Sequence, residues 1–174
     1  KSIVTRINAE LANNLGNLVQ RTLSQINKNC AGAVPQPAVL EDIDQALLHQ
    51  CGLEMLNAVR IEFDRMQFNK ALEIIVQAAN AANIYIDAQA PWTLKKTDTT
   101  RMQTVLYVLA EAIRNLGLIL QPFCPQASAR ILDQVAVPAD QRDFAHIGPL
   151  HSLKPATVLP APAGVFPRIV EAAA

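Results

Sequence analysis

Two groups of side chains in this sequence have the chemistry needed to contact a nucleobase. Asn17 and Arg21 lie four positions apart, so a helix would project both from one face. Trp92, the only tryptophan, follows Pro91 at the point where a helical pattern stops. A carboxamide donates and accepts hydrogen bonds, a guanidinium grips a base edge or a phosphate through two bonds, and an exposed indole offers a flat face. These residue types predict a base-reading surface.

Each residue also has a simpler interpretation. A lone tryptophan after a proline often plugs the end of a helix, and Asn17 or Arg21 alone would be an ordinary polar residue on an exposed helix. Their segment, however, carries a polar stripe about a quarter-turn from its apolar stripe, a position that suits the wall of a groove. The stripe consists of Asn14, Asn17, Arg21, Gln25 and Lys28.

The two segments that carry these residues resemble, in this order, the anticodon-binding helical domain of bacterial methionyl-tRNA synthetases. They are residues 15–21 (LGNLVQR) and 83–92 (NIYIDAQAPW), and the resemblance extends over about residues 3–137. In that family an asparagine and an arginine on one helix, and a tryptophan after a proline, contact the anticodon. The resemblance implies that Trp92 stacks on the first anticodon base, a cytosine, that Pro91 shapes its turn, and that Asn17 and Arg21 help to read the loop.

The same resemblance implies the partners of this chain. They are the anticodon loop of methionine tRNA and a nucleotide-binding catalytic domain, which is expected before residue 1. That domain would hold ATP and magnesium, so this chain alone is expected to contain no catalytic residue and no cofactor and to be inactive. Residues 164–169 (GVFPRI) resemble the stretch in which such chains return toward the catalytic domain.

The charge of the chain argues against strong, general binding of nucleic acid. Net charge is zero, with 15 basic and 15 acidic residues, whereas general binders carry an excess of lysine and arginine to neutralise phosphates. Basic residues nevertheless gather just after Trp92, so any contact is expected to be local. The candidate phosphate contacts are Lys28, Lys95, Lys96 and Arg101.

No motif in the sequence predicts catalysis or a metal site. His146-Ile147-Gly148 matches the start of the His-Ile-Gly-His signature of class I synthetases, but Pro149 replaces the second histidine, so we interpret the match as coincidence. The Lys-Met-Ser-Lys-Ser loop, a phosphate-binding loop and a hydrolase nucleophile elbow are all missing. The cysteines are scattered and predict free thiols: Cys30, Cys51 and Cys124.

Composition predicts a helical, cytoplasmic protein. Apolar residues make up 51% of the chain and aromatic residues only 5%, with alanine, leucine and isoleucine dominant. No run of about 18 uncharged apolar residues predicts a membrane span. The N-terminal residues lack the order of a signal peptide, since Arg6 and Glu10 interrupt them.

Apolar residues at three- and four-residue steps predict an all-α fold: an antiparallel helical bundle of about five helices over residues 1–137. The expected helices run from Ser2 to a loop at residues 30–40, from about Glu41 to Arg65 with a weak point at Gly52, from about Asn69 to Pro91, from Thr97 or Asp98 to Leu120, and from Pro125 to about Val135.

Residues 138–174 are expected to form an irregular, proline-rich C-terminal tail, because prolines interrupt every regular pattern there. We interpret this tail as an extended strap that can be removed without unfolding the bundle.

Three functions remain open from the sequence. The first is the anticodon-binding domain of a methionine–tRNA ligase. The second is the corresponding domain of another class I synthetase, such as those for cysteine, isoleucine or valine. The third is a helical adaptor that binds no nucleic acid, which only the neutral charge favours.

Overall fold

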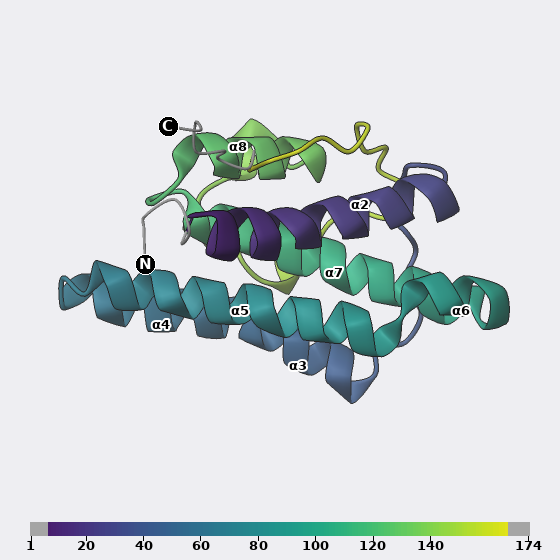
Figure 1. Cartoon of the computed structure of the whole chain (residues 1–174), viewed down its shortest axis with the longest axis horizontal. Helices are drawn as coiled ribbons and strands as arrows, with labels where there is room; N and C mark the ends of the chain where they lie inside the picture. The colour runs from purple at the N-terminus through teal and green to yellow at the C-terminus, as the bar shows by residue number, and fades with distance from the viewer. Residues whose placement is uncertain (1–6, 167–174) are drawn as a thin grey trace, which may run out of the picture.

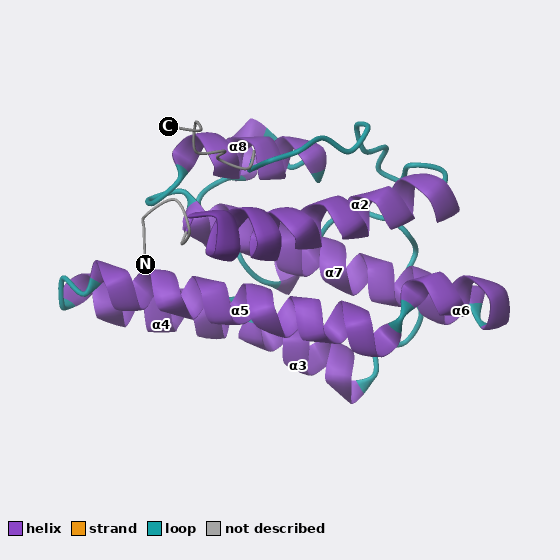
Figure 2. Cartoon of the chain, in the orientation of Figure 1, coloured by secondary structure: helices purple, strands orange, loops and turns teal. Residues whose placement is uncertain are grey.

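The computed structural model describes residues 7–166, which form an antiparallel bundle whose arms alternate in direction along the chain (Figure 1). Within that range the regular elements are helices, joined by loops (Figure 2). The first arm is the π-helix η1 (Ile7–Gly16) continued by α2 (Asn17–Asn29), and the second is α3 (Asp42–Gln50) with α4 (Leu53–Asp64). The remaining arms are α5 (Phe68–Gln89), α7 (Thr99–Leu120) and α8 (Pro125–Gln134), with the short helix α6 (Pro91–Thr97) between α5 and α7. The predicted fold class is confirmed.

Helix α7 forms the centre of the bundle and contacts α2, α3, α5, α6 and α8. It is the one helix of the described range that is long and apolar enough to cross a membrane, yet 89% of its most apolar stretch is buried inside the bundle. Burial of that kind is expected of a core helix.

Caps confirm three of the predicted helix starts, at Glu41, Asp98 and Pro125, while the start predicted at Ser2 lies outside the described residues. The Asp98 carboxylate accepts a hydrogen bond of 2.9 Å from the backbone N–H of Arg101, which satisfies one of the free donors at the start of α7. Glu41 and Asp44 form a reciprocal capping box at the start of α3. Pro125 occupies the first turn of α8, where its missing N–H costs no helical hydrogen bond.

The single helix expected from Glu41 to Arg65 is wrong, because the chain breaks between α3 and α4 at Cys51 and Gly52. A Cβ atom at Gly52 would lie 2.7 Å from the backbone oxygen of Leu48, so only glycine fits this bend. The sequence marked the position as weak, but not as a break.

The turn before Trp92 contains one predicted feature, a non-helical Ala90, and one feature that was not predicted, the helix α6. Ala90 leaves helical geometry ahead of Pro91, as predicted, and adopts a left-handed conformation with φ 44° and ψ 62°. Pro91 then begins the seven-residue helix α6, which the sequence analysis did not predict. So short a helix has too few apolar positions to show a period.

Residues 138–166 of the tail are irregular, as expected, with three short 3-10 turns: η2 (Ala139–Gln141), η3 (Phe144–His146) and η4 (Pro149–His151). Residues 167–174 of the predicted tail lie outside the described residues. The packing of residues 138–166, however, argues against a removable strap. Four tail side chains are buried in the same hydrophobic core as the helices, namely Ile147, Leu153, Leu159 and Val165. We therefore expect removal of the tail to expose core surface and destabilise the bundle.

A buried ion pair on α7 holds the tail in place. Arg114 pairs with Glu111 at 3.0 Å and donates hydrogen bonds to the backbone oxygens of His146 (2.7 Å) and Gly148 (3.3 Å). Glu111 in turn accepts a hydrogen bond from the backbone N–H of Leu153. The His146-Ile147-Gly148 segment thus contributes backbone acceptors to tail packing, in keeping with its interpretation as a coincidental match.

Candidate nucleic-acid interface

The η1–α2 arm and α5 run side by side in the same direction and are joined by polar side chains (Figure 1). Asn14 donates a hydrogen bond of 2.9 Å to Asn80 and accepts one of 2.6 Å from Asn83. Two turns farther along, Arg21 pairs with Asp87 at 2.5 Å between Nη2 and Oδ1. These contacts set the axial register of the two arms and place Arg21 beside the last turns of α5.

Trp92 lies directly beside this ion pair. The guanidinium carbon of Arg21 is 5.3 Å from the centroid of the Trp92 ring, within the range of a cation–π interaction. The left-handed Ala90 and the buried Pro91 end α5 and begin α6, which contacts α2. Trp92 keeps 37% of its surface exposed, so the predicted proximity of Arg21 to an accessible tryptophan is confirmed.

Asn17 lies one turn before Arg21 on α2 and is exposed, as predicted. Its side chain makes no hydrogen bond within residues 7–166, which leaves both its donor and its acceptor open to a ligand. It borders a hollow of about 500 Å3 between the first arm and residues 164–166 of the tail. Within the described residues no hydrogen bond or ring contact joins Asn17 to Trp92, so the structure does not bring these two predicted site residues together.

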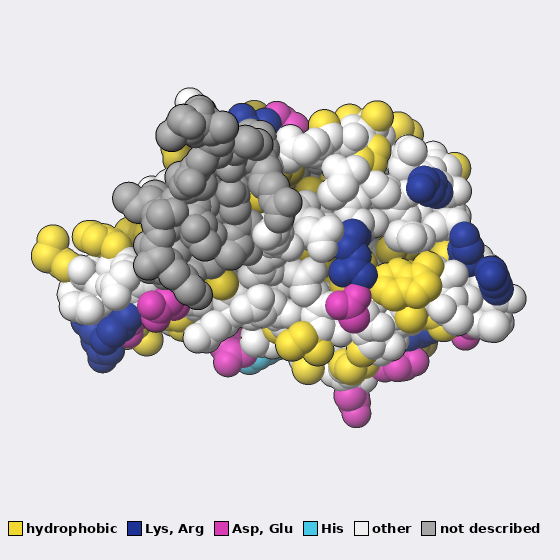
Figure 3. All heavy atoms as spheres, in the orientation of Figure 1, with side chains coloured by type: hydrophobic (Ala, Val, Ile, Leu, Met, Phe, Trp, Pro, Cys, Tyr) yellow, Lys and Arg dark blue, Asp and Glu magenta, His cyan; other side chains and the backbone are white. Residues whose placement is uncertain are grey.

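Three of the four candidate phosphate contacts remain available. Lys28, Lys95 and Lys96 are exposed, and none forms an ion pair with another residue of the described range. Lys95 and Lys96 belong to the last turn of α6, which begins with the Pro91-Trp92 pair. On the face that carries α2 and α6, two basic side chains lie next to each other at the right edge, and the other basic side chains are separate from them (Figure 3).

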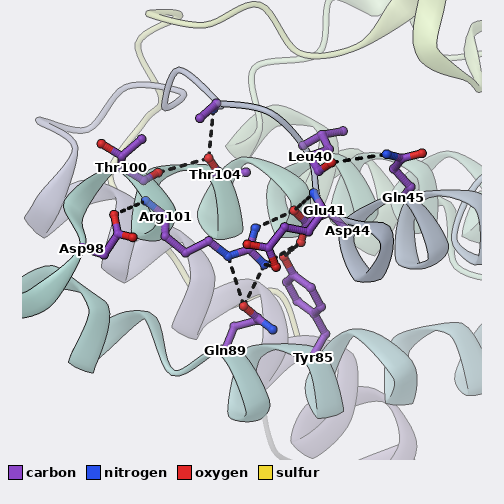
Figure 4. Close-up of polar contacts among 11 residues, drawn as sticks. Leu40, Glu41, Asp44, Gln45, Tyr85, Gln89, Asp98, Thr100, Arg101 and Thr104 are labelled. Carbon is purple, nitrogen blue, oxygen red and sulfur yellow. Dashed lines mark hydrogen bonds and ion pairs between the residues drawn. The ribbon is translucent and has the colours of Figure 1, made fainter.

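The fourth candidate, Arg101, is corrected by the structure. Its side chain is only 12% exposed and donates hydrogen bonds of 2.5 and 2.8 Å to the two carboxylate oxygens of Asp44 (Figure 4). It also donates to the side-chain oxygen of Gln89 at 2.8 Å. A guanidinium whose donors are used in this way is not available to a phosphate. The partner lies 57 positions away in the sequence, so the local run of basic residues could not reveal it.

Comparison with known proteins shows which family this chain belongs to. A family model described as the anticodon binding domain of methionyl tRNA ligase matches residues 34–174. The chain belongs to this family. The matched range includes Trp92 and begins after Arg21. Among the class I synthetases that the sequence left open, the match identifies the methionyl-tRNA ligase family.

Relatives of this methionyl-tRNA ligase domain align over nearly the whole chain. Methionine–tRNA ligases of Mesorhizobium japonicum and Brucella suis are 48% and 49% identical over 98% and 99% of the chain. The crystal structure of the free methionyl-tRNA synthetase of Mycobacterium tuberculosis superposes with a TM-score of 0.93 at 43% identity, over 98% of this chain and 34% of that one. The chain spans about a third of the length of these relatives.

A buried polar cluster supports the Trp92 turn of this anticodon-binding domain. The Tyr85 hydroxyl donates to Asp44 at 2.5 Å, so Asp44 joins α3 to α5 through Tyr85 and to α7 through Arg101 (Figure 4). Burial by itself would raise the pKa of Asp44, but hydrogen bonds from Arg101, Tyr85 and the Glu41 backbone outweigh it and lower that pKa. Burial and the Asp44 charge raise the pKa of Tyr85. The cluster therefore contains an ionised carboxylate and a neutral phenol.

Asp87 is the residue of the candidate interface that the sequence did not reveal. One signal was present: Asp87 follows Asn83 by four positions and Asn80 by seven, so all three lie on the α5 face that contacts the first arm. The ion pair itself could not be inferred, because the register of the two arms depends on contacts between residues 66 to 69 positions apart.

No group of histidine, cysteine, aspartate or glutamate side chains within residues 7–166 has the geometry to hold a metal ion. Cys51 is buried, and its burial raises the pKa of the thiol to about 12. Cys30 and Cys124 are half-buried free thiols, and burial raises the pKa of each.

Proposed function

We propose that the surface formed by Asn17, Arg21 and Trp92 binds the anticodon loop of methionine tRNA. The observation that carries this proposal is the exposed Trp92 ring, held beside the Arg21–Asp87 ion pair at 5.3 Å from the guanidinium. A flat ring offers stacking to an unpaired base, and the adjacent guanidinium and carboxamide offer hydrogen bonds to base edges or phosphates.

In the free domain Arg21 occupies the surface of Trp92 that a base could use. Its ion pair with Asp87 is solvent-exposed, and such pairs contribute about 0–1 kcal/mol. Stacking of a base on an aromatic side chain contributes about 1–3 kcal/mol. An incoming base therefore provides enough free energy to move the guanidinium off the ring, after which Arg21 can contact the base edge or the backbone of the loop.

Binding through this surface is local, because the chain has no net charge. Lys95 and Lys96 would contact phosphates beside the stacked base, and Lys28 would contact the backbone near the end of α2. Few phosphate contacts imply a shallow dependence of affinity on salt. Specificity then rests on the stacked base and on the groups that face it.

The remainder of a methionine–tRNA ligase would supply the chemistry. We propose that ATP and magnesium bind in that part, that it forms the aminoacyl bond in the cytoplasm, and that this domain selects the tRNA. The described residues offer candidate anticodon contacts and no hydrogen-bonded pair of a nucleophile and a base, so we expect the chain alone to be inactive in aminoacylation.

The decisive experiment is Trp92→Ala in the full-length ligase. We expect kcat/KM for tRNA to fall by the equivalent of about 1–3 kcal/mol, because the stack is lost. ATP–pyrophosphate exchange without tRNA should not change. Ile84→Ala is a matched control, since Ile84 is an apolar side chain on α5 that is 70% exposed and contributes no stacking surface.

The opposite result has a clear meaning. If Trp92→Ala lowered the melting temperature while aminoacylation and the choice of anticodon stayed intact, Trp92 would be a structural plug of the α5–α6 turn. A gel-shift comparison of initiator tRNA with a tRNA that bears another anticodon gives an independent measure of specificity.

A further inference from the structure

The short helix that carries Trp92 lies in a loop whose two ends are joined by side chains. Gln89 is the last residue of α5, and Arg101 lies in the first turn of α7, 12 positions later. The Arg101 guanidinium donates two hydrogen bonds to the side-chain oxygen of Gln89, one of 3.3 Å from Nε and one of 2.8 Å from Nη2 (Figure 4). These contacts close, at its base, the loop that contains α6.

Arg101 provides a rigid donor for this contact. Its guanidinium contacts both carboxylate oxygens of the buried Asp44 on α3, and Glu41 lies 3.4 Å from Nη2. A planar guanidinium held by two bonds cannot change its direction without breaking a buried charge pair. Gln89 is therefore held by a fixed group, and the last turn of α5 is tied to both α3 and α7.

The backbone between Gln89 and Trp92 needs such support. Ala90 has φ 44°, in the left-handed region that residues with a Cβ atom rarely adopt. Its backbone oxygen accepts the first helical hydrogen bonds of α6, from Thr93 at 2.8 Å and from Leu94 at 3.2 Å. If the end of α5 were free to move, Ala90 could relax to an ordinary conformation, and the direction of α6 would change with it. The Trp92 ring would then leave its place beside α2.

We propose that Gln89 is a positioning residue for anticodon recognition. By accepting two hydrogen bonds from a charged donor, which are stronger than bonds between neutral groups, Gln89 holds the Trp92 ring beside Arg21, where a base can stack. Gln89 acts through Trp92 and does not itself contact the base. This inference rests on the proposed function, because it requires that Trp92 contacts the anticodon loop.

The test compares Gln89→Met with Gln89→Glu in the full-length ligase. Methionine keeps the length of the side chain and removes the acceptor oxygen, whereas glutamate keeps an acceptor for Arg101. We expect Gln89→Met to raise KM for tRNA about tenfold with kcat unchanged, because a hydrogen bond to a charged group is lost and binding is weakened uniformly. Gln89→Glu should keep a KM close to that of the wild type. An equal KM in the two variants, raised or not, would overturn the proposal.

A double-mutant cycle separates positioning from general support of the fold. In a ligase that carries Trp92→Ala, Gln89→Met should cause no further rise in KM for tRNA, because the ring that Gln89 positions is missing. An equal tenfold rise in that background would show that Gln89 acts independently of Trp92, which contradicts the proposal. Gln77→Met is the matched control and should leave KM unchanged, because Gln77 is exposed on the same helix and makes no hydrogen bond within residues 7–166.

The single variants also distinguish a failure of this inference from a failure of the proposed function. If Trp92→Ala alone left KM for tRNA unchanged, the anticodon surface would be wrong, and the role of Gln89 with it. If Trp92→Ala raised KM and Gln89→Met did not, Trp92 would contact tRNA without help from Gln89. Only the positioning role would then be overturned.

Discussion

Two arginine–aspartate pairs flank the C-terminal end of α5. Their shortest contacts have the same length, but their exposure to solvent and their number of contacts differ. Both have a nitrogen–oxygen distance of 2.5 Å. In the Arg101–Asp44 pair the side chains are 12% and 0% exposed, and the guanidinium contacts both carboxylate oxygens. In the Arg21–Asp87 pair they are 31% and 61% exposed, a single contact joins them, and Arg21 also lies over Trp92.

The difference shows that contact distance does not determine the role of an ion pair. Asp44 is removed from water and is satisfied by Arg101, Tyr85 and the Glu41 backbone, so none of its partners can leave without stranding a buried charge. Arg21 can exchange Asp87 for water or for a ligand at little cost. The buried pair holds the Trp92 turn in place, and the exposed pair is the one that our proposal assigns to tRNA contact.

The largest expected effect is that of Asp44→Ala. Removal of the carboxylate leaves Arg101 charged and enclosed and leaves the Tyr85 hydroxyl without its acceptor. We expect the free energy of unfolding to fall by about 3–5 kcal/mol, as is typical when one partner of a buried pair is deleted. Urea denaturation measures this change. A loss below about 1 kcal/mol would place Asp44 in the same class as an exposed ion pair.

Acid should weaken the buried cluster in a defined pH window. The folded-state pKa of Asp44 is lower than its ordinary value of 3.8, so its ionised form stabilises the fold fully above that value. This stability is lost as pH falls through the lower folded-state pKa. We expect the unfolding free energies of the wild type and of Asp44→Asn to converge on acidification below pH 3.8. A constant difference between them down to low pH would contradict the assignment.

The exposed pair should contribute much less to folding. A double-mutant cycle with Arg21→Ala and Asp87→Ala is expected to give a coupling energy for unfolding below about 1 kcal/mol. The same Arg21→Ala change should reduce aminoacylation in the full-length ligase, because the guanidinium beside Trp92 is lost. A coupling energy as large as that of the buried pair would mean that Arg21 is structural and unavailable to tRNA.

The smallest effect on stability is expected for the lysines of α6. Lys95→Ala and Lys96→Ala should leave unfolding unchanged, since both side chains are exposed. If they contact phosphates, each should reduce the slope of log affinity against log salt concentration by about one while sparing the choice of anticodon. Lys70→Ala, on the distant start of α5, should leave the slope unchanged. If all three variants gave the same slope of log affinity against log salt concentration, the α6 lysines would not contact phosphates.

The sequence by itself determined the local features of this protein. Helix starts at Glu41, Asp98 and Pro125, the non-helical Ala90 and the presence of about five arms all follow from periods, caps and prolines, whose effects extend over a few residues. The side chains of the candidate interface were likewise visible, because side-chain type and helical spacing are local properties.

Only the tertiary structure decided which of these groups are free to act. Lys95, Lys96 and Arg101 form one basic run in the sequence, yet Arg101 is enclosed by a carboxylate 57 positions away while the two lysines face solvent. The pairing of Arg21 with Asp87 depends in the same way on the register of two arms, and the inclusion of the tail depends on core packing. Propensities and caps arise from neighbouring residues, whereas burial and the choice of ion-pair partner arise from contacts between distant segments, which exist only once the chain has folded.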